Sequence, residues 1–113
     1  KCPITMMTFL TDNPSSCGIV ELDEYGIVRN FFEKIKNPPT NLANGAVYIF
    51  DSKIFDFLEN LNKERIDIST EVLPNFIGQI ATFHNDVYHR DIGTIESYAL
   101  SQVEILKIKL DKI

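Results

Sequence analysis

Three polar side chains that could bind a charged, hydroxyl-rich ligand flank one loop of the sequence. Glu33 and Lys34 follow an aromatic pair at the end of a predicted strand, and Asn44 with Gly45 precedes the next strand. A strand, a loop and a strand bring the loop ends together, so these groups can face one pocket. A carboxylate accepts from sugar hydroxyls, an ammonium neutralises a phosphate, and an amide both donates and accepts. The alternative is a solvated strand end at Glu33 and Lys34, with a turn at Asn44 and Gly45.

A second candidate group is the carboxylate of Asp91, in the run RDIGT before the last predicted helix. An aspartate at such a place either ligates a metal or bonds the N–H groups of its own turn. His84 and His89 lie near it in sequence. Two imidazoles and a carboxylate without the spacing of a known ligand set favour a place on the strand surface. Arg90 is expected to contact either a phosphate or an acid.

Strands and helices that would position these groups alternate along the chain. Hydrophobic patterns predict strands over 4–11, 18–22, 27–32, 46–50, 79–85 and 87–89, and helices over 52–61, 69–78 and 94–113. Gly26 allows a hairpin turn between the second and third strands. The strand 46–50 is almost wholly apolar, which predicts burial on both faces.

The helices have capping residues and apolar stripes. Asp51 or Ser52, Ser69 and Thr94 stand where they can cap the three predicted helices. Phe55 and Phe57 are expected in the core. The stripe on the last helix, which runs through Leu110 and Ile113, predicts that this helix packs on a sheet or docks on something outside the chain.

The length, composition and net charge of the chain limit the class of protein. The chain has 113 residues, of which 44% are hydrophobic and 24% charged, which indicates one globular domain over residues 1–113. The net charge of -5 argues against a nucleic-acid partner and an anionic membrane surface. No apolar run approaches the ~20 residues that span a bilayer. Cys2 and Cys17 are too few for a zinc quartet or a disulfide scaffold, which predicts free thiols and a cytoplasmic location.

Three motifs in a fixed order relate the chain to a known family. They are CGIVELDEYGIV, then FFEKIKNPPTNLANGAVYIF, then DIGTIESY. In these motifs the chain resembles the sugar-1-phosphate nucleotidyltransferases (NDP-sugar pyrophosphorylases), and more narrowly their mannose- and heptose-1-phosphate guanylyltransferase branch. The resemblance covers nearly all of the chain. It implies an α/β fold: a mixed central sheet with flanking helices, the C-terminal part of a Rossmann-like nucleotidyltransferase domain.

The resemblance also implies a reaction and roles for residues. In the family, the phosphate of a sugar 1-phosphate attacks the α-phosphate of a nucleoside triphosphate, with Mg²⁺ offsetting charge, and pyrophosphate leaves. Glu33 is similar to the carboxylate that binds sugar hydroxyls, and Lys34 to the lysine on the sugar phosphate. Asn44 and Gly45 resemble the strand entry that lines the sugar. Asp91 is similar to the second metal-binding aspartate, so Lys34 and Asp91 are the expected catalytic residues and all these groups should meet in one cavity.

The sequence departs from the family pattern in the part that binds the nucleoside triphosphate. The family's glycine-rich loop is absent, since the five glycines are scattered at Gly18, Gly26, Gly45, Gly78 and Gly93. Ile35 replaces the usual proline after Glu-Lys, and His89-Arg90 replaces an aromatic segment. We therefore expect the sugar-phosphate-binding, C-terminal half of a GDP-mannose or GDP-heptose type enzyme, cut at Lys1 from a longer protein, inactive alone and able to form homo-oligomers. The alternative is a non-catalytic binding or assembly domain.

Overall fold

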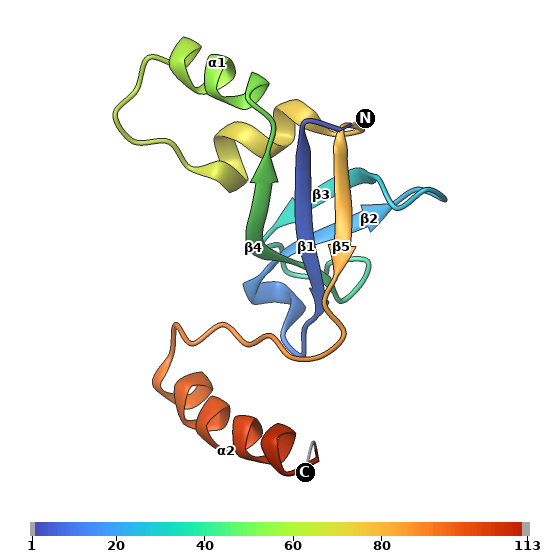
Figure 1. Ribbon diagram of the computed structural model, residues 1–113, viewed down its shortest axis with the longest axis vertical. Helices are drawn as coiled ribbons and strands as arrows, with labels where there is room; N and C mark the ends of the chain where they lie inside the picture. The colour runs from blue at the N-terminus through green and yellow to red at the C-terminus, as the bar shows by residue number, and fades with distance from the viewer. Residues whose placement is uncertain (1, 112–113) are drawn as a thin grey trace.

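A five-stranded mixed sheet forms the centre of the computed structural model, which describes residues 2–111 (Figure 1). The strands are β1 (Ile4–Leu10), β2 (Gly18–Leu22), β3 (Val28–Glu33), β4 (Leu42–Phe50) and β5 (Ile80–His84), in the order β3-β2-β4-β1-β5. β1 pairs parallel with β5 and antiparallel with β4, and β2 pairs antiparallel with β3 and β4. The predicted α/β fold with a mixed central sheet is confirmed.

The main core lies between the sheet and the segment that joins β4 to β5. That segment contains α1 (Lys53–Asn60), a π-helical turn (Ile68–Val72) and a 3-10 turn (Leu73–Phe76). The fully buried side chains of this core are Ile4, Met6, Val20, Val28, Ile54, Val72, Leu73 and Ile80. A smaller cluster of Phe9, Ile19 and Ala43 packs with Cys17 and Phe32. The smaller cluster matters for function because Phe9 and Cys17 also line the cavities described below.

The Asn-Gly pair lies inside β4 and not in a turn, which corrects the turn expected at Asn44 and Gly45. The strand is nevertheless bent there: Ala46 has a φ of 58°, and the pairing with β1 shifts register between Met6 and Thr8. Asn44 Oδ1 accepts the Ala46 N–H at 2.8 Å, so a side chain satisfies a backbone donor at the irregularity. Such a bulge redirects side chains next to it.

One face of β4 is exposed, against the prediction of burial on both faces. Val47 is 54% exposed and Ile49 72% exposed, whereas Tyr48 and Phe50 stack on each other at 5.5 Å beside the core. The cause is the alternation of strand side chains. The exposure is confined to the part of the strand after Gly45, since Ala43, earlier in β4, is fully buried with Phe9 and Ile19.

Aspartates cap the first two helical segments. Asp51, one of the two predicted capping residues, caps α1, since Asp51 Oδ1 accepts the Lys53 N–H at 3.0 Å. Asp67 rather than Ser69 caps the π-helical turn, by accepting the Thr70 N–H. In each case the capping residue is an aspartate, whose charge suits a helix N-terminus.

Two further predictions, on the burial of a phenylalanine pair and on a short strand, are corrected by the structure. Phe57 packs edge-on against Phe76 with ring centroids 5.0 Å apart, as expected of a core residue, but Phe55 is 60% exposed. The expected strand over 87–89 is absent from the described chain, where Asn85 Oδ1 accepts the Val87 N–H in an irregular loop. Side-chain bonds replace strand pairing there.

The last helix, α2 (Ile95–Asp111), stands beyond the end of the sheet opposite to α1 (Figure 1). Thr94 caps it as predicted, since its Oγ1 accepts the Ser97 N–H at 3.1 Å. Of the two alternatives for this helix, packing on the sheet finds no support among the side chains described, and docking on something outside the chain stays a prediction. Its exposed apolar residues are Ile95, Tyr98, Leu100, Val103, Ile105 and Leu106. Ile113 and the side chain of Leu110 lie outside what the structure describes.

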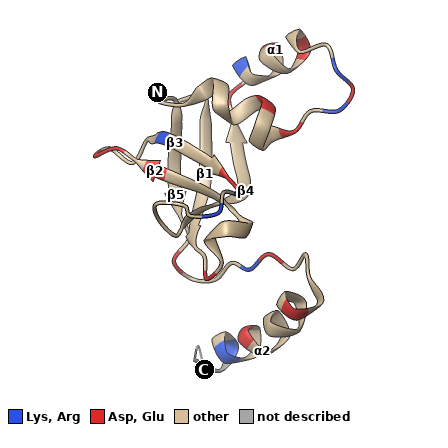
Figure 2. Ribbon diagram, turned by 180° about the vertical axis from the view of Figure 1, so that it is seen from behind, with Lys and Arg blue, Asp and Glu red and all other residues tan. Residues whose placement is uncertain are grey.

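Charged residues are distributed over several elements of the described chain (Figure 2). Acidic positions at the β2–β3 turn and mixed charges after α1 are clearly separated in this view. The helices within residues 2–111 include none with the length and apolarity to cross a membrane.

Candidate functional site

A cavity of about 390 Å³ brings the candidate residues of the sequence together. Glu33, Lys34, Asn44, Gly45 and Asp91 all line it. The rest of its wall is formed by Phe9, Ser16, Cys17, Gly18, Ala46, Ser69, His89, Arg90 and Ile92. Residues from separate parts of the chain therefore meet around one space, and the acid, the base and the amide line it from the end of β3 and from β4.

Backbone geometry at the end of β3 positions the acid and the base. Glu33 is the last residue of β3 and lies opposite Gly18 in the β2–β3 register. Lys34 follows with a φ of 52°, and its N–H donates to the Cys17 carbonyl at 3.0 Å. Non-glycine residues rarely occupy this region, and strained backbone of this kind is enriched at functional sites. The chain turns sharply at Lys34, which places consecutive charged side chains on one cavity.

Hydrogen bonds fix the orientation of the Asn44 amide. Its oxygen accepts a backbone N–H, and its Nδ2 donates to the Tyr48 hydroxyl at 2.7 Å. Burial is the largest cause of a raised pKa of Tyr48, whereas the hydrogen bond from Asn44 acts in the opposite direction. Tyr48 therefore remains a neutral phenol at neutral pH, and the amide beside it is held rigidly.

Asp91 lies exposed in the segment before α2. Its backbone carbonyl accepts from the Ser97 hydroxyl, which fastens it to the first turn of the helix. Among the described residues, no N–H of the turn bonds the Asp91 carboxylate, so the turn-capping alternative finds no support. The carboxylate is thus available to a ligand at the cavity wall.

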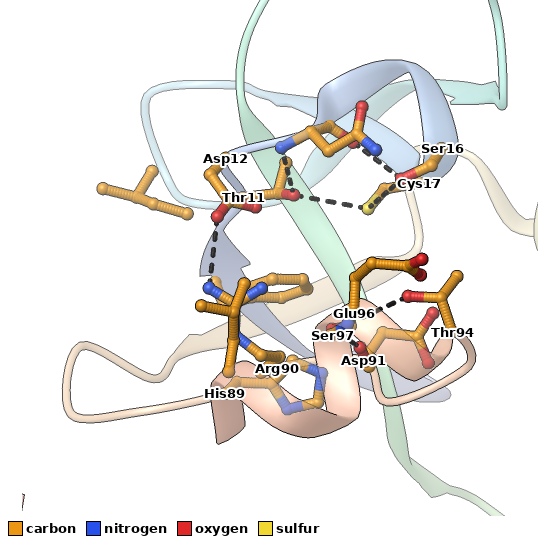
Figure 3. Close-up of a pocket in the computed structure, with 14 residues that line it drawn as sticks. Thr11, Asp12, Ser16, Cys17, His89, Arg90, Asp91, Thr94, Glu96 and Ser97 are labelled. Carbon is orange, nitrogen blue, oxygen red and sulfur yellow. Dashed lines mark hydrogen bonds and ion pairs between the residues drawn. The ribbon is translucent and has the colours of Figure 1, made fainter. Parts of the chain in front are cut away.

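A second cavity, of about 540 Å³ (Figure 3), adjoins the first. The two share Phe9, Ser16, Cys17, His89, Arg90 and Asp91. Thr11, Asp12, Ser16 and Cys17 come from the segment after β1 and face the residues that lead into α2. Asp91 therefore lines both cavities.

Arg90 pairs with acids, which settles the choice left open by the sequence. Its Nε lies 2.5 Å from Glu104 Oε1 and its Nη2 3.0 Å from Glu104 Oε2, while Nη2 is 3.1 Å from Asp12 Oδ2. Tyr88 also donates to Glu104 Oε1, at 2.9 Å. These acids raise the pKa of Arg90, and Arg90 is the largest cause of the lowered pKa of Glu104. The bidentate pair ties α2 to the sheet through the residue that precedes Asp91.

This pair predicts how stability changes with pH. Because the folded-state pKa of Glu104 is lowered from its ordinary 4.5, its contribution is present above pH 4.5 and is lost as pH falls through the folded-state value. Glu104→Gln should therefore lower the urea midpoint at pH 7, and the difference from wild type should shrink as the pH falls below about 4.5. Glu96→Gln, on the same helix, is the control and should change little. A difference that is independent of pH would contradict the ion pair.

The histidines take structural places. His84 Nδ1 and Thr8 Oγ1 lie 3.0 Å apart, and the His89 ring packs on Phe9 with centroids 4.3 Å apart. Within residues 2–111, no three or more His, Cys, Asp or Glu side chains group as a metal site would require. Any metal at Asp91 would have to take its remaining ligands from water and from substrate phosphates, as Mg²⁺ commonly does.

Several residues in the wall were not among the sequence candidates, Gly18 and Ser69 among them. Gly18 was assigned only to the start of a strand, and its pairing with Glu33 is known only from the structure. Ser69 was assigned to a helix cap. No local pattern points from Ser69 to a site formed by distant strands.

Comparisons with known proteins place the chain in a family. Residues 1–107 match the profile of the family described as nucleotidyl transferase. The bifunctional protein GlmU of Methanococcus aeolicus is 36% identical over 88% of this chain and 26% of its own length. Glucose-1-phosphate adenylyltransferase 2 of Vibrio parahaemolyticus is 27% identical over 95% of this chain and 32% of its own length. A mannose-1-phosphate guanylyltransferase of Mycobacterium tuberculosis is 24% identical over 95% of this chain and 30% of its own length.

The fold agrees with these similarities. A Bacillus anthracis structure assigned as a glucose-1-phosphate thymidylyltransferase, in complex with sucrose, superposes with a TM-score of 0.78 at 19% identity, over 91% of this chain and 43% of that one. The chain spans about a third or less of the length of the curated relatives it matches. On the match of nearly its whole length, the chain belongs to the nucleotidyl transferase family.

Proposed function

We propose that this chain is the sugar-1-phosphate-binding part of a nucleotidyltransferase that makes an NDP-sugar, of the GDP-mannose or GDP-heptose type, in the cytoplasm. The observation that carries the proposal is the cavity in which Glu33, Lys34, Asn44 and Asp91 meet. Relatives named for adenylyl, guanylyl and thymidylyl transfer to sugar phosphates support the substrate class. The guanylyl branch rests on the motif resemblance.

The chemistry of the cavity suits such a substrate. Lys34 supplies an ammonium for the phosphate, and Glu33 is an acceptor for ring hydroxyls. Asn44 adds an amide whose orientation is already fixed. Held in this way, the sugar phosphate presents an oxygen for in-line attack on the α-phosphate of a nucleoside triphosphate, and pyrophosphate leaves. Without a glycine-rich triphosphate loop, the printed chain binds the sugar phosphate but does not turn it over.

Asp91 is the residue that would hold Mg²⁺. A single exposed carboxylate fits this ion, which uses one or two carboxylates together with substrate phosphates and water. The ion would supply positive charge against the phosphate oxygens. The chain's own contribution is to fix that carboxylate beside the sugar-phosphate cavity, through the bond from Ser97 to the Asp91 carbonyl and through the neighbouring Arg90 clamp.

Titration of the ¹⁵N-labelled chain with mannose 1-phosphate tests the proposal. The amide signals of Glu33, Lys34 and Asn44 should shift together and saturate. Free mannose and inorganic phosphate are the controls, and each alone should bind more weakly because it lacks half of the contacts. Glucose 1-phosphate tests the guanylyl-type assignment, which requires a preference for the mannose or heptose compound. Saturable shifts elsewhere with none at these three amides would overturn the proposed site.

A further inference from the structure

We propose that Glu104 is a positioning residue for the metal-binding carboxylate of Asp91, and that it acts through Arg90. This inference rests on the proposed function, in which Asp91 holds Mg²⁺, and deepens it with a residue outside the site. Glu104 lies in the third turn of α2 and lines neither cavity. Any effect of Glu104 on a bound ligand must therefore pass through its partners.

Two attachments to α2 hold the backbone around Asp91. In the first turn of the helix, the Ser97 hydroxyl donates to the carbonyl of Asp91 itself. In the third turn, Glu104 accepts from Arg90, the residue before Asp91, through Nε at 2.5 Å and Nη2 at 3.0 Å. The backbone is thus held at Asp91 and at the residue before it, so the Asp91 side chain starts from one fixed place.

Arg90 also connects this arrangement to the sheet. Its Nη2 donates at 3.1 Å to Asp12, in the segment after β1 (Figure 3). The two acids are unequal: the Glu104 side chain binds both nitrogens and is 33% exposed, whereas the Asp12 side chain accepts one bond and is 71% exposed. Exposed single ion pairs contribute little, and bidentate pairs fix geometry. Glu104 is therefore the partner that sets the position of Arg90.

Tyr88 holds the Glu104 carboxylate as well. Its hydroxyl donates to Glu104 Oε1 at 2.9 Å. The backbone of Tyr88 is fixed by the Asn85 side chain, whose Nδ2 donates to the Tyr88 carbonyl at 2.9 Å. Asn85 in turn donates its own N–H to the Thr8 carbonyl of β1 at 2.8 Å. Groups anchored in the sheet thus hold Glu104, and with it the segment that carries Asp91.

Charge and position make opposite predictions for Arg90, which allows a sharp test. Arg90 is a cation next in sequence to the proposed metal ligand, so by charge alone Arg90→Gln should strengthen metal binding. If Arg90 positions Asp91, the same variant should weaken it. Glu104→Gln should weaken it under either account. The double variant has the net charge of wild type, so charge alone predicts wild-type affinity, whereas positioning predicts the weak affinity of the single variants.

The probe is Mn²⁺, added to the ¹⁵N-labelled chain with saturating mannose 1-phosphate, and the readout is paramagnetic broadening of the Asp91, Ile92 and Gly93 amide signals. Arg90→Gln, Glu104→Gln and the double variant should each need about tenfold more Mn²⁺ for half-maximal broadening, the lower end of the effect of residues that support metal ligands. The double variant should keep the wild-type dissociation constant for mannose 1-phosphate alone.

Two further variants serve as controls. Glu96→Gln removes a carboxylate of the same helix that is not among the described partners of Arg90, and should change the Mn²⁺ requirement by no more than about twofold. Glu104→Asp keeps the charge and shortens the side chain, so it should also weaken Mn²⁺ binding, and it replaces the double variant if that one does not fold. Far-ultraviolet circular dichroism checks the folding of each variant.

Each contrary result has its own pattern. Tighter Mn²⁺ binding by Arg90→Gln, or wild-type binding by the double variant or by Glu104→Asp, would overturn the inference while the proposed function stands. A double variant that also loses mannose 1-phosphate would mean that the cluster supports the whole site and not Asp91 in particular, which overturns it equally. If Mn²⁺ leaves the Asp91 signal of wild type sharp, the metal role of Asp91 fails together with this inference.

Discussion

Lys34→Ala is expected to weaken binding of mannose 1-phosphate by about tenfold to a hundredfold, because a hydrogen bond to a charged group contributes about 1.5–3 kcal/mol. Lys34 is the lysine in the wall of the 390 Å³ cavity, next to Glu33. The substitution should not change the conformational strain of the backbone. Alanine meets the same penalty as lysine at a φ of 52°, so the variant removes the ammonium without relieving strain. Fluorescence or NMR titration at fixed ionic strength measures the change.

Lys36→Ala is the matched control for charge. Lys36 is exposed, lies two positions further along the same loop and contributes to neither cavity wall. It should leave the dissociation constant within about twofold, since isolated surface charges are screened by salt. Equal losses in the two variants would mean that net charge, and not a contact of Lys34, governs binding.

Gly18→Ala should reduce binding by about tenfold and also lower stability. A Cβ at Gly18 would come within 2.8 Å of the Phe31 ring and 2.9 Å of Glu33 Oε1. Both neighbours must move: the Glu33 carboxylate, which ends a flexible side chain and leaves its place opposite Gly18, and the Phe31 ring, which packs against the core. The expected decrease in stability is about 1–3 kcal/mol, the range for overpacking. Urea unfolding and ligand titration of one sample measure both quantities.

Gly78→Ala should lower stability without weakening binding. Gly78 has a φ of 87°, and nothing lies within 4 Å of the Cβ that alanine would add. Alanine is strained there, which costs about 1 kcal/mol or more of stability, but Gly78 is not part of the cavity wall. The affinity of the Gly78→Ala variant for mannose 1-phosphate should match that of wild type. If Gly18→Ala instead bound normally, Glu33 would not need its present position.

Local patterns predicted the elements that local bonding creates. The turn with Gly26, the Thr94 cap and the helix after Asp51 follow from residues within a few positions of each other, and all are present. The sequence also identified Glu33 and Lys34 as a candidate pair of binding residues, because they are adjacent. Their roles in binding stay predictions.

Features that depend on strand order could not be read from the chain. The bend in β4 at Ala46 arises where β4 pairs with β1. A Cβ at Gly45 would lie 2.5 Å from Met7 Cε and 3.2 Å from the Met7 carbonyl oxygen, so the two strands approach closely there. Ser69 reaches the cavity only because the segment before β5 folds over β4. The position of α2 depends on one cluster around Arg90, and its apolar stripe gave no hint that an ion pair would hold it.

The cavity wall is assembled from residues near positions 9–18, 33–46, 69 and 89–92, which are joined through strands far apart in the chain. A partly unfolded molecule, in which any one of these segments has detached, has no intact wall to offer. A ligand of this cavity therefore acts on the equilibrium of the whole domain, raising the free energy of unfolding by RT ln(1 + [L]/Kd). Thermal melting in the presence of candidate sugar phosphates would rank them by affinity without any catalytic turnover.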